Sequence, residues 1–407
     1  MSQSTARDQL LIPINQQPAN NTNPLMLELM EYYQQNIAGK LAWVDGPANP
    51  WRQTIIRLAC VSHMVFCAIL SLSSEDLAHK YAHDHARRHY LQKISFRFRN
   101  TALTLLAEQI RSMRDPQTLQ NGDVDANGTR YAVASTLILY NVELLVAQGV
   151  EWRMHLQAAR LILQWREQTL SNVASFDYVD TFLCYEHYYA SVFAGLTTFG
   201  AAHEPTGDRI KNTSDITTFS HFVHIIHRVT QIERLGYDQG ISIEFAQIHN
   251  ILREVEVARC EMEQLGRRIH FQSYNAKQDF QHLVSIFYHA TLIYSYQVST
   301  KDSSIDSIVR MSRDLILDHL NSLSHKETFA HDLVWPLFIL GTECRGLPEV
   351  QGIVSQEIEA VMKLSGVLDR PRVLSFLRHY WSLDLDRSVT WIDLMRECVP
   401  DNSMLIL

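Results

Sequence analysis

The sequence predicts an all-α fold, a multi-helix globular domain of about a dozen helices joined by short loops. Apolar residues recur at steps of three and four along most of the 407 residues, which is the spacing of one helix face. Gly (15) and Pro (11) are scarce, and hardly any stretch alternates between apolar and polar residues, so a turn-rich β architecture is excluded. Hydrophobic residues make up 46% and charged residues 20%, which excludes disorder over most of the chain.

The first half of the chain begins with a polar segment and continues as a series of helical patterns. Residues 1–23 are rich in Asn, Gln and Pro and predict a flexible, disordered arm. Asn23 and Pro24 predict a helix start, because Asn caps a first turn and Pro fits its first position. Ser74 with Asp76 predicts another start. In order, the expected elements are a helix from residue 24, a turn-rich connector at 41–51, helices at 52–71 and 74–113, a loop at 115–128, paired helices at 131–147 and 152–169, and a helix at 176–198.

The second half shows the same helical spacing after one polar loop. The expected elements are the loop at 200–215 and helices at 216–234, 241–271, 275–299, 303–323, 327–345, 348–366, 369–382 and 389–398. No repeat of equal period and no shift in composition divides these segments. We therefore expect one domain over residues 24–407, preceded by the arm.

Charge and cysteine content exclude several classes of protein. The formal net charge is −8, with 36 Lys and Arg against 44 Asp and Glu, so broad electrostatic capture of nucleic acid is not expected. Six cysteines are spread through the chain with no CxxC pair, which excludes a CxxC-type zinc site and a disulfide framework. The first residues lack a signal-peptide pattern, and no apolar run reaches the roughly 20 residues of a membrane span. The expected compartment is the nucleus or the cytosol.

Three stretches carry a resemblance to a known family. They are Asn49-Pro50-Trp51-Arg52 with the run Ala68–Leu72, Glu143-Leu144-Leu145 with Trp152–Arg160, and Trp335–Glu343 with Trp381 and Trp391–Met395. Their order and spacing resemble the fungal-specific transcription factor domain of the second type, over nearly the whole chain from Asn23. In fungal activators this helical regulatory region normally follows a Zn2Cys6 binuclear zinc cluster.

The sequence departs from this family pattern at the DNA-binding element. The zinc cluster needs six closely spaced cysteines near the N-terminus, and here no cysteine precedes Cys60. The resemblance therefore implies that any DNA contact is indirect. Relatives without the cluster include regulators of secondary-metabolite gene clusters, such as trichothecene pathway regulators. Others are non-canonical sesquiterpene cyclases of fungal tropolone pathways.

Our leading hypothesis is a nuclear, pathway-specific transcriptional regulator of a secondary-metabolite cluster, with mycotoxin biosynthesis as an example. The resemblance implies that it acts through protein partners of the transcription machinery, a finger-bearing relative or a small-molecule ligand, and a homodimer is also open. No catalytic residue, metal ligand or cofactor is assigned under this hypothesis, which is non-enzymatic.

The alternative hypothesis is a magnesium-dependent sesquiterpene cyclase on the same fold, with Asp177, Asp180 and Glu186 as candidate ligands. A cyclase needs carboxylates to hold Mg²⁺ on a diphosphate and aromatic rings to stabilise carbocations, and these residues lie in an aromatic-rich helical segment. The DDxxD motif is absent. The competing structural interpretation makes Asp177 an N-cap ahead of a core helix with a buried glutamate.

Two further patterns have both a functional and a structural interpretation. The stretch Arg87–Arg99 interleaves cations with aromatic residues, which is typical of a phosphate-contacting or nuclear-import surface. It also fits an amphipathic helix that buries Tyr90, Leu91, Ile94 and Phe98 and keeps its cations in water. Several histidines are three or four residues apart, so a helix would place them on one face, where a pair could bind zinc, but the sequence predicts no third ligand. These pairs and steps are His79 with His83, His85 with His89, and His221, His224 and His227.

The segment from Asp123 to Gly128 copies the first half of a calcium-binding EF-hand loop. The twelfth position is Ala134 in place of the closing glutamate, so the segment predicts a turn and no calcium site.

Overall fold

The computed structural model describes residues 23–46, 48–113, 126–146, 151–170, 177–199, 219–240, 245–271, 273–299, 306–366, 370–383, 389–398 and 405–406. These ranges contain fifteen α-helices and no strand, which confirms the all-α prediction. No helix within them combines the length and apolar character that a membrane span requires. The predicted arm, apart from Asn23, the predicted loop at 200–215 and most of the predicted loop at 115–128 lie outside the described residues. The last three residues of the latter, 126–128, are described and form the first turn of a helix, so the loop and the turn predicted there are wrong at these positions.

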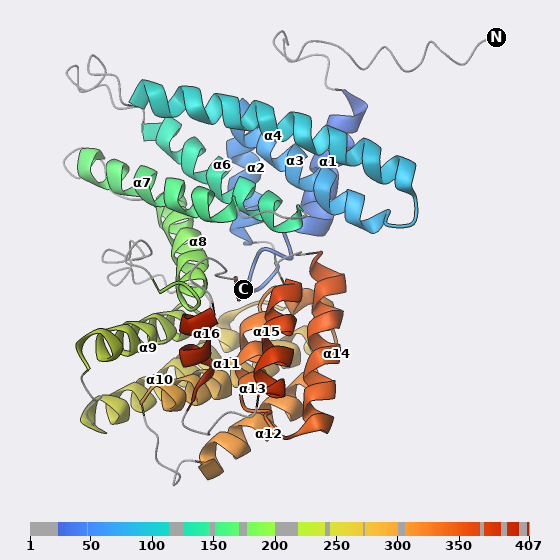
Figure 1. The fold of residues 1–407 in the computed structure, drawn as a ribbon. Coiled ribbons are helices and arrows are strands. Elements are labelled where there is room, and N and C mark those ends of the chain that lie inside the picture. Colours follow the sequence, from blue (N-terminus) through green and yellow to red (C-terminus); the bar gives the residue numbers. More distant parts are fainter. Residues whose placement is uncertain are drawn as a thin grey trace.

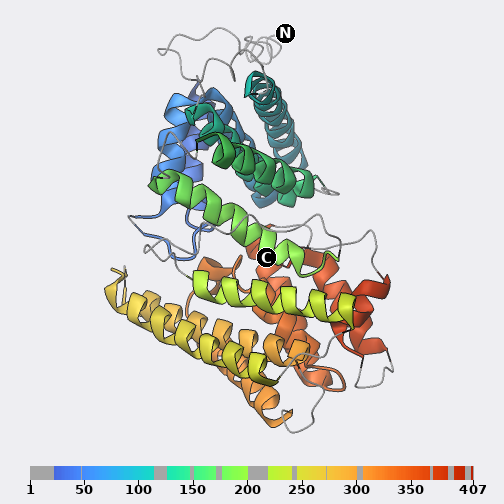
Figure 2. The same ribbon diagram turned by 90° about the vertical axis from the view of Figure 1, so that its left-hand side faces the viewer.

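The helices form two lobes joined by one helix (Figure 1). Helix α8 (Tyr178–Gly195) runs from one lobe to the other, and the second view shows the same arrangement (Figure 2). The N-terminal lobe comprises α1 (Pro24–Tyr32), the π-helical η2 (Tyr33–Ile37), α2 (Pro50–Val61), α3 (His63–Lys80), α4 (His85–Met113), α6 (Ala126–Leu145) and α7 (Trp152–Leu170). The C-terminal lobe comprises α9 (Ser220–Gln239), α10 (Phe245–Arg268), α11 (Tyr274–Ser299), α12 (Asp306–Ser322), the 3-10 helix η6 (Lys326–Phe329), α13 (Val334–Thr342), α14 (Pro348–Ser365), α15 (Arg370–Ser382) and α16 (Trp391–Cys398).

Helix α3 is the centre of the N-terminal lobe. Residues 67–76 are all buried, because α4, α6 and α2 pack around them. The predicted helix at 52–71 and the predicted start at Ser74 are wrong. Ser62 adopts an extended conformation (φ −123°, ψ 112°) that ends α2, and its Oγ accepts from the backbone N–H of Val65 (3.4 Å). Ser74 lies inside α3, where its hydroxyl donates to the carbonyl of Leu70 (2.7 Å).

Helix α11 has the corresponding position in the C-terminal lobe and packs against α9, α10, α12 and α13. The helix predicted at 327–345 is divided in the structure. It consists of the short η6 and, from Val334, the fully buried α13. Pro336 lies in the first turn of α13, where a missing backbone N–H costs no helical hydrogen bond.

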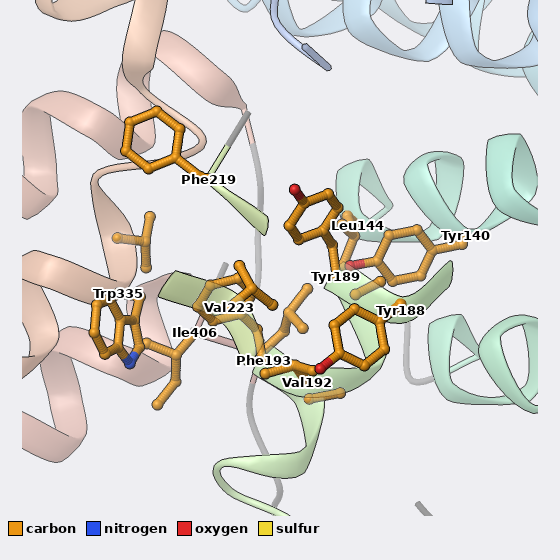
Figure 3. Packing of buried hydrophobic residues seen from close by; sticks show 14 of the residues in the cluster. Tyr140, Leu144, Tyr188, Tyr189, Val192, Phe193, Phe219, Val223, Trp335 and Ile406 are labelled. Atoms are coloured by element: carbon orange, nitrogen blue, oxygen red, sulfur yellow. The ribbon is translucent and has the colours of Figure 1, made fainter. Parts of the chain in front are cut away.

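The two lobes share one apolar contact region around α8 (Figure 3). Tyr188, Tyr189, Val192 and Phe193 of α8 lie between Tyr140 and Leu144 of α6 on one side and the C-terminal lobe on the other. Ile406, near the end of the chain, is fully buried in the same region.

The predicted connector at 41–51 also contributes to this contact. The Trp43 ring stacks on Phe219 with a centroid distance of 4.8 Å and meets Phe287 edge-on at 5.3 Å. Trp43 therefore anchors the N-terminal lobe in the aromatic core of the C-terminal lobe.

Candidate functional site

Asp177 is the N-cap of α8, as the structural interpretation of the sequence expects. Its Oδ1 accepts from the backbone N–H groups of Val179 (2.9 Å) and Asp180 (3.0 Å). The Asp180 carboxylate accepts in return from the backbone N–H of Asp177 (3.5 Å), which completes a capping box. The local sequence therefore gives Asp177 a structural role at the first turn.

Asp180 is buried and held by two arginines from the N-terminal lobe. Arg130 of α6 donates from Nε (2.8 Å) and from Nη2 (2.7 Å), and Arg166 of α7 donates from Nη2 (2.9 Å). Burial alone would raise the pKa of Asp180, but the hydrogen bonds and charges of the two guanidinium groups outweigh it, so this pKa lies below its usual value. A magnesium ion at Asp180 would have to displace both arginines.

Glu186 lies on the same helix but in a different environment. Six helical residues amount to about 600° of rotation, so Glu186 points away from the direction of Asp180. Burial, together with the nearby charge of Asp332, raises the pKa of Glu186 to about 8, although the Trp51 indole acts in the opposite direction. The three candidate ligands do not converge on one site.

Metal binding by the histidines finds no support in the described part of the chain, where no three His, Cys, Asp or Glu side chains are grouped closely enough to hold a metal ion. The predicted histidines instead have separate partners. His79 bonds to the carbonyl of Leu145 through Nε2 (2.7 Å), His221 pairs with Glu261, and His224 bonds to the Tyr188 hydroxyl through Nδ1 (2.8 Å).

A histidine cluster that the sequence does not predict lies between α11 and α12. The Nδ1 atoms of His282 and His319 are 3.0 Å apart, and the ring of His289 stacks near that of His319 at 6.4 Å. Burial lowers the pKa of His289 to about 4, so it is neutral near pH 7. His282 and His319 are 37 residues apart, and only the packing of the two helices brings them together.

The cysteines do not form a zinc cluster among the described residues. Cys60 and Cys260 are exposed on different helices, and Cys67 and Cys344 are buried. Burial raises the pKa of both buried thiols to about 12, which keeps them protonated. The side chain of Cys398 lies outside the described residues.

The interior near the lobe contact is densely filled. A cavity of about 20 Å³ lies there, lined by Ile37, Lys40, Leu41, Leu72, Asn141, Leu144, Leu145, His331 and Ser365. This volume suits about one water molecule, and a sesquiterpene precursor would need several hundred Å³. This cavity is therefore not a cyclase active site.

The basic stretch lies on α4, and three of the four side chains predicted to face the core do so. Leu91, Ile94 and Phe98 are buried as expected, but the prediction for Tyr90 is wrong because 44% of its surface is exposed. Tyr90 precedes Leu91 by one position, about 100° around the helix, which turns it away from the core.

Comparison with known proteins gives one match. The model of the fungal specific transcription factor domain family matches residues 28–405, which confirms the resemblance drawn from the three sequence stretches. No curated protein and no solved structure matches the chain.

Proposed function

This chain belongs to the fungal-specific transcription factor domain family and is a transcriptional regulator, and we propose that it controls a secondary-metabolite pathway from the nucleus through a protein partner. The observation that carries the proposal is the family match over residues 28–405 on a chain whose first cysteine is Cys60. The 407 residues contain no closely spaced set of six cysteines, which supports a finger-bearing partner as the source of the DNA contact.

The cavity at the lobe contact offers no room for a bound metabolite. The small cavity at the lobe contact admits about one water molecule, whereas metabolite pockets usually enclose a few hundred Å³. A regulator of this kind would transmit its signal through its surface. Mycotoxin pathways are the kind of target that the finger-less relatives suggest.

A gene deletion compared with its parent strain tests the proposal, with transcripts and metabolites measured in the same cultures. We expect the transcripts of a contiguous set of biosynthetic genes to fall together and to return on complementation with the wild-type gene. Loss of one terpenoid with those transcripts unchanged would contradict the proposal.

A second measurement separates the regulator from the cyclase directly. The purified chain is incubated with Mg²⁺ and farnesyl diphosphate, and hydrocarbon products are measured by gas chromatography. We expect no product beyond that of a boiled sample. A sesquiterpene that disappears in Asp180→Asn would overturn the assignment.

A further inference from the structure

A row of basic and aromatic side chains lies exposed along the N-terminal half of α4. The residues are His89, Tyr90, Lys93, Phe96 and Arg97, and we call them the α4 stripe. Three-residue steps connect Tyr90, Lys93 and Phe96, and four-residue steps connect His89, Lys93 and Arg97, so the five share one face of the helix over about 12 Å. Helix α4 lies at the outer edge of the N-terminal lobe (Figure 1), with its apolar face on α3.

The stripe is positively charged on a chain whose net charge is −8. Residues 85–107 contain no Asp or Glu. Two arginines of α4 are already engaged, since Arg99 pairs with Glu143 (3.0 Å) and Arg87 lies 3.8 Å over the Tyr81 ring. Lys93 and Arg97 form no ion pair with any residue that the structure describes. Their charges are available to an external anion.

The exposed aromatic residues of the stripe indicate which class of anionic partner it can bind. Phe96 exposes 54% of its surface and Tyr90 44%, both within one turn of a stripe cation. Contact with a phosphodiester backbone uses cations and donors and leaves Phe96 without a favourable contact. A membrane surface would require a broad apolar face, but the apolar face of α4 is already buried in the core. The complementary surface must therefore combine negative charge with apolar side chains at a spacing of a few ångströms.

The first residues of this chain do not meet that requirement. Residues 1–22 contain one Asp and one Arg, so they carry no net charge to match the stripe. This N-terminal segment therefore does not supply the complementary surface.

We propose that the α4 stripe docks an acidic amphipathic helix of a protein partner. Carboxylates of that helix pair with Lys93 and Arg97, and its apolar side chains pack on Tyr90 and Phe96. Arg88, with His85 and Gln92, lines an open hollow that continues past His89 and offers a further contact for acidic groups. This proposal names the kind of partner that the proposed regulator binds. The docking itself does not depend on the proposed function, but its role in transcription does.

Binding of a synthetic probe to the full chain tests the proposal. The probe is a fluorescein-labelled helical peptide of about 20 residues with Leu at the core heptad positions and Glu beside them. We expect saturable binding by fluorescence anisotropy that weakens from about 50 mM to about 500 mM NaCl. The double variant Lys93→Glu/Arg97→Glu and the single variant Phe96→Ala should each weaken binding about tenfold or more.

Matched controls keep the result specific to the stripe. Arg57→Glu, at an exposed position of α2, and Tyr274→Ala on α11 change a surface cation and a surface aromatic elsewhere, and both should bind as the wild type does. Circular dichroism should show the same helix content in every variant. Equal binding by the stripe variants would overturn the proposal.

Two other probes distinguish the competing surfaces. Duplex DNA of about 30 base pairs, or phosphatidylserine vesicles, bound through Lys93 and Arg97 more tightly than the peptide would also overturn it. So would a concentration-dependent dimer in sedimentation that the stripe variants abolish, because the stripe would then bind a second copy. Transcript loss in the deletion strain is measured separately, so failure of either proposal is recognisable.

Discussion

Replacing Glu186 with Gln should stabilise the protein near neutral pH. The side chain lies partly buried on α8, where burial and the charge of Asp332 raise its pKa from the usual 4.5 to about 8. At pH 7 the folded chain therefore holds a proton on Glu186 that the unfolded chain releases. This difference lowers the free energy of unfolding, and a neutral glutamine of similar size removes it.

The magnitude follows from the shift and the pH. Each pKa unit corresponds to about 1.4 kcal/mol, and the ionisation of Glu186 alone costs stability at that rate as the pH rises from 4.5 towards 8. We expect Glu186→Gln to add about 2 to 3 kcal/mol at pH 7, with an allowance for residual contact with solvent. At pH 4.5 the pH-dependent part of the difference in unfolding free energy should be absent, and only the difference due to the amide itself should remain.

Urea unfolding at a series of pH values between 4.5 and 8.5 measures the difference. The control is Glu108→Gln, which makes the same change at an exposed glutamate on α4. The reasoning is refuted if the gap between wild type and Glu186→Gln does not widen as the pH rises. A narrowing gap would mean that the ionised carboxylate is stabilised in the fold.

Four further substitutions test the packing and the charges. Gly341→Ala should cost about 1 to 3 kcal/mol in urea unfolding, because its Cβ would come within 2.7 Å of a buried leucine, whereas Gly352→Ala, in open space on α14, should be neutral or stabilising by up to about 1 kcal/mol. Arg166→Leu should cost about 3 to 5 kcal/mol because it removes one partner of the buried Asp180 pair, and a cost near zero would show that Arg130 alone suffices. Burial lowers the pKa of His187 to about 4, so the contribution of His187 to the unfolding free energy falls as pH drops from 6.5 towards 4, and the wild type should lose stability relative to His187→Gln over that range.

Local signals in the sequence identify many of the helices and their starts. Asn23, before a proline, caps α1 as predicted. Asn49, also before a proline, caps α2, although the predicted connector at 41–51 included both of these residues. The spacing of apolar residues does not locate the end of a helix when the helix is buried on all sides. The apolar run through Ser62 looks continuous because α3 is buried on almost every side, and only the backbone shows that the chain breaks there.

The candidate site could be predicted only in its local part. The cap at Asp177 depends on residues two and three positions away, so the sequence reveals it. The partners of Asp180 lie 50 and 14 residues away on two other helices, and no pattern connects them. The same holds for Trp43, whose contacts with Phe219 and Phe287 depend on how the lobes pack.

Glu186 and His187 are neighbours on α8 with opposite effects of pH. Burial raises the pKa of the carboxyl to about 8 and lowers that of the imidazole to about 4, so both groups stay neutral in the fold. Stability falls with rising pH because of Glu186 and with falling pH because of His187. Between about pH 4.5 and 6.5 the two slopes are similar in size and opposite in sign, so this pair contributes a plateau. Above 6.5 only the glutamate slope remains, and stability should decline towards pH 8.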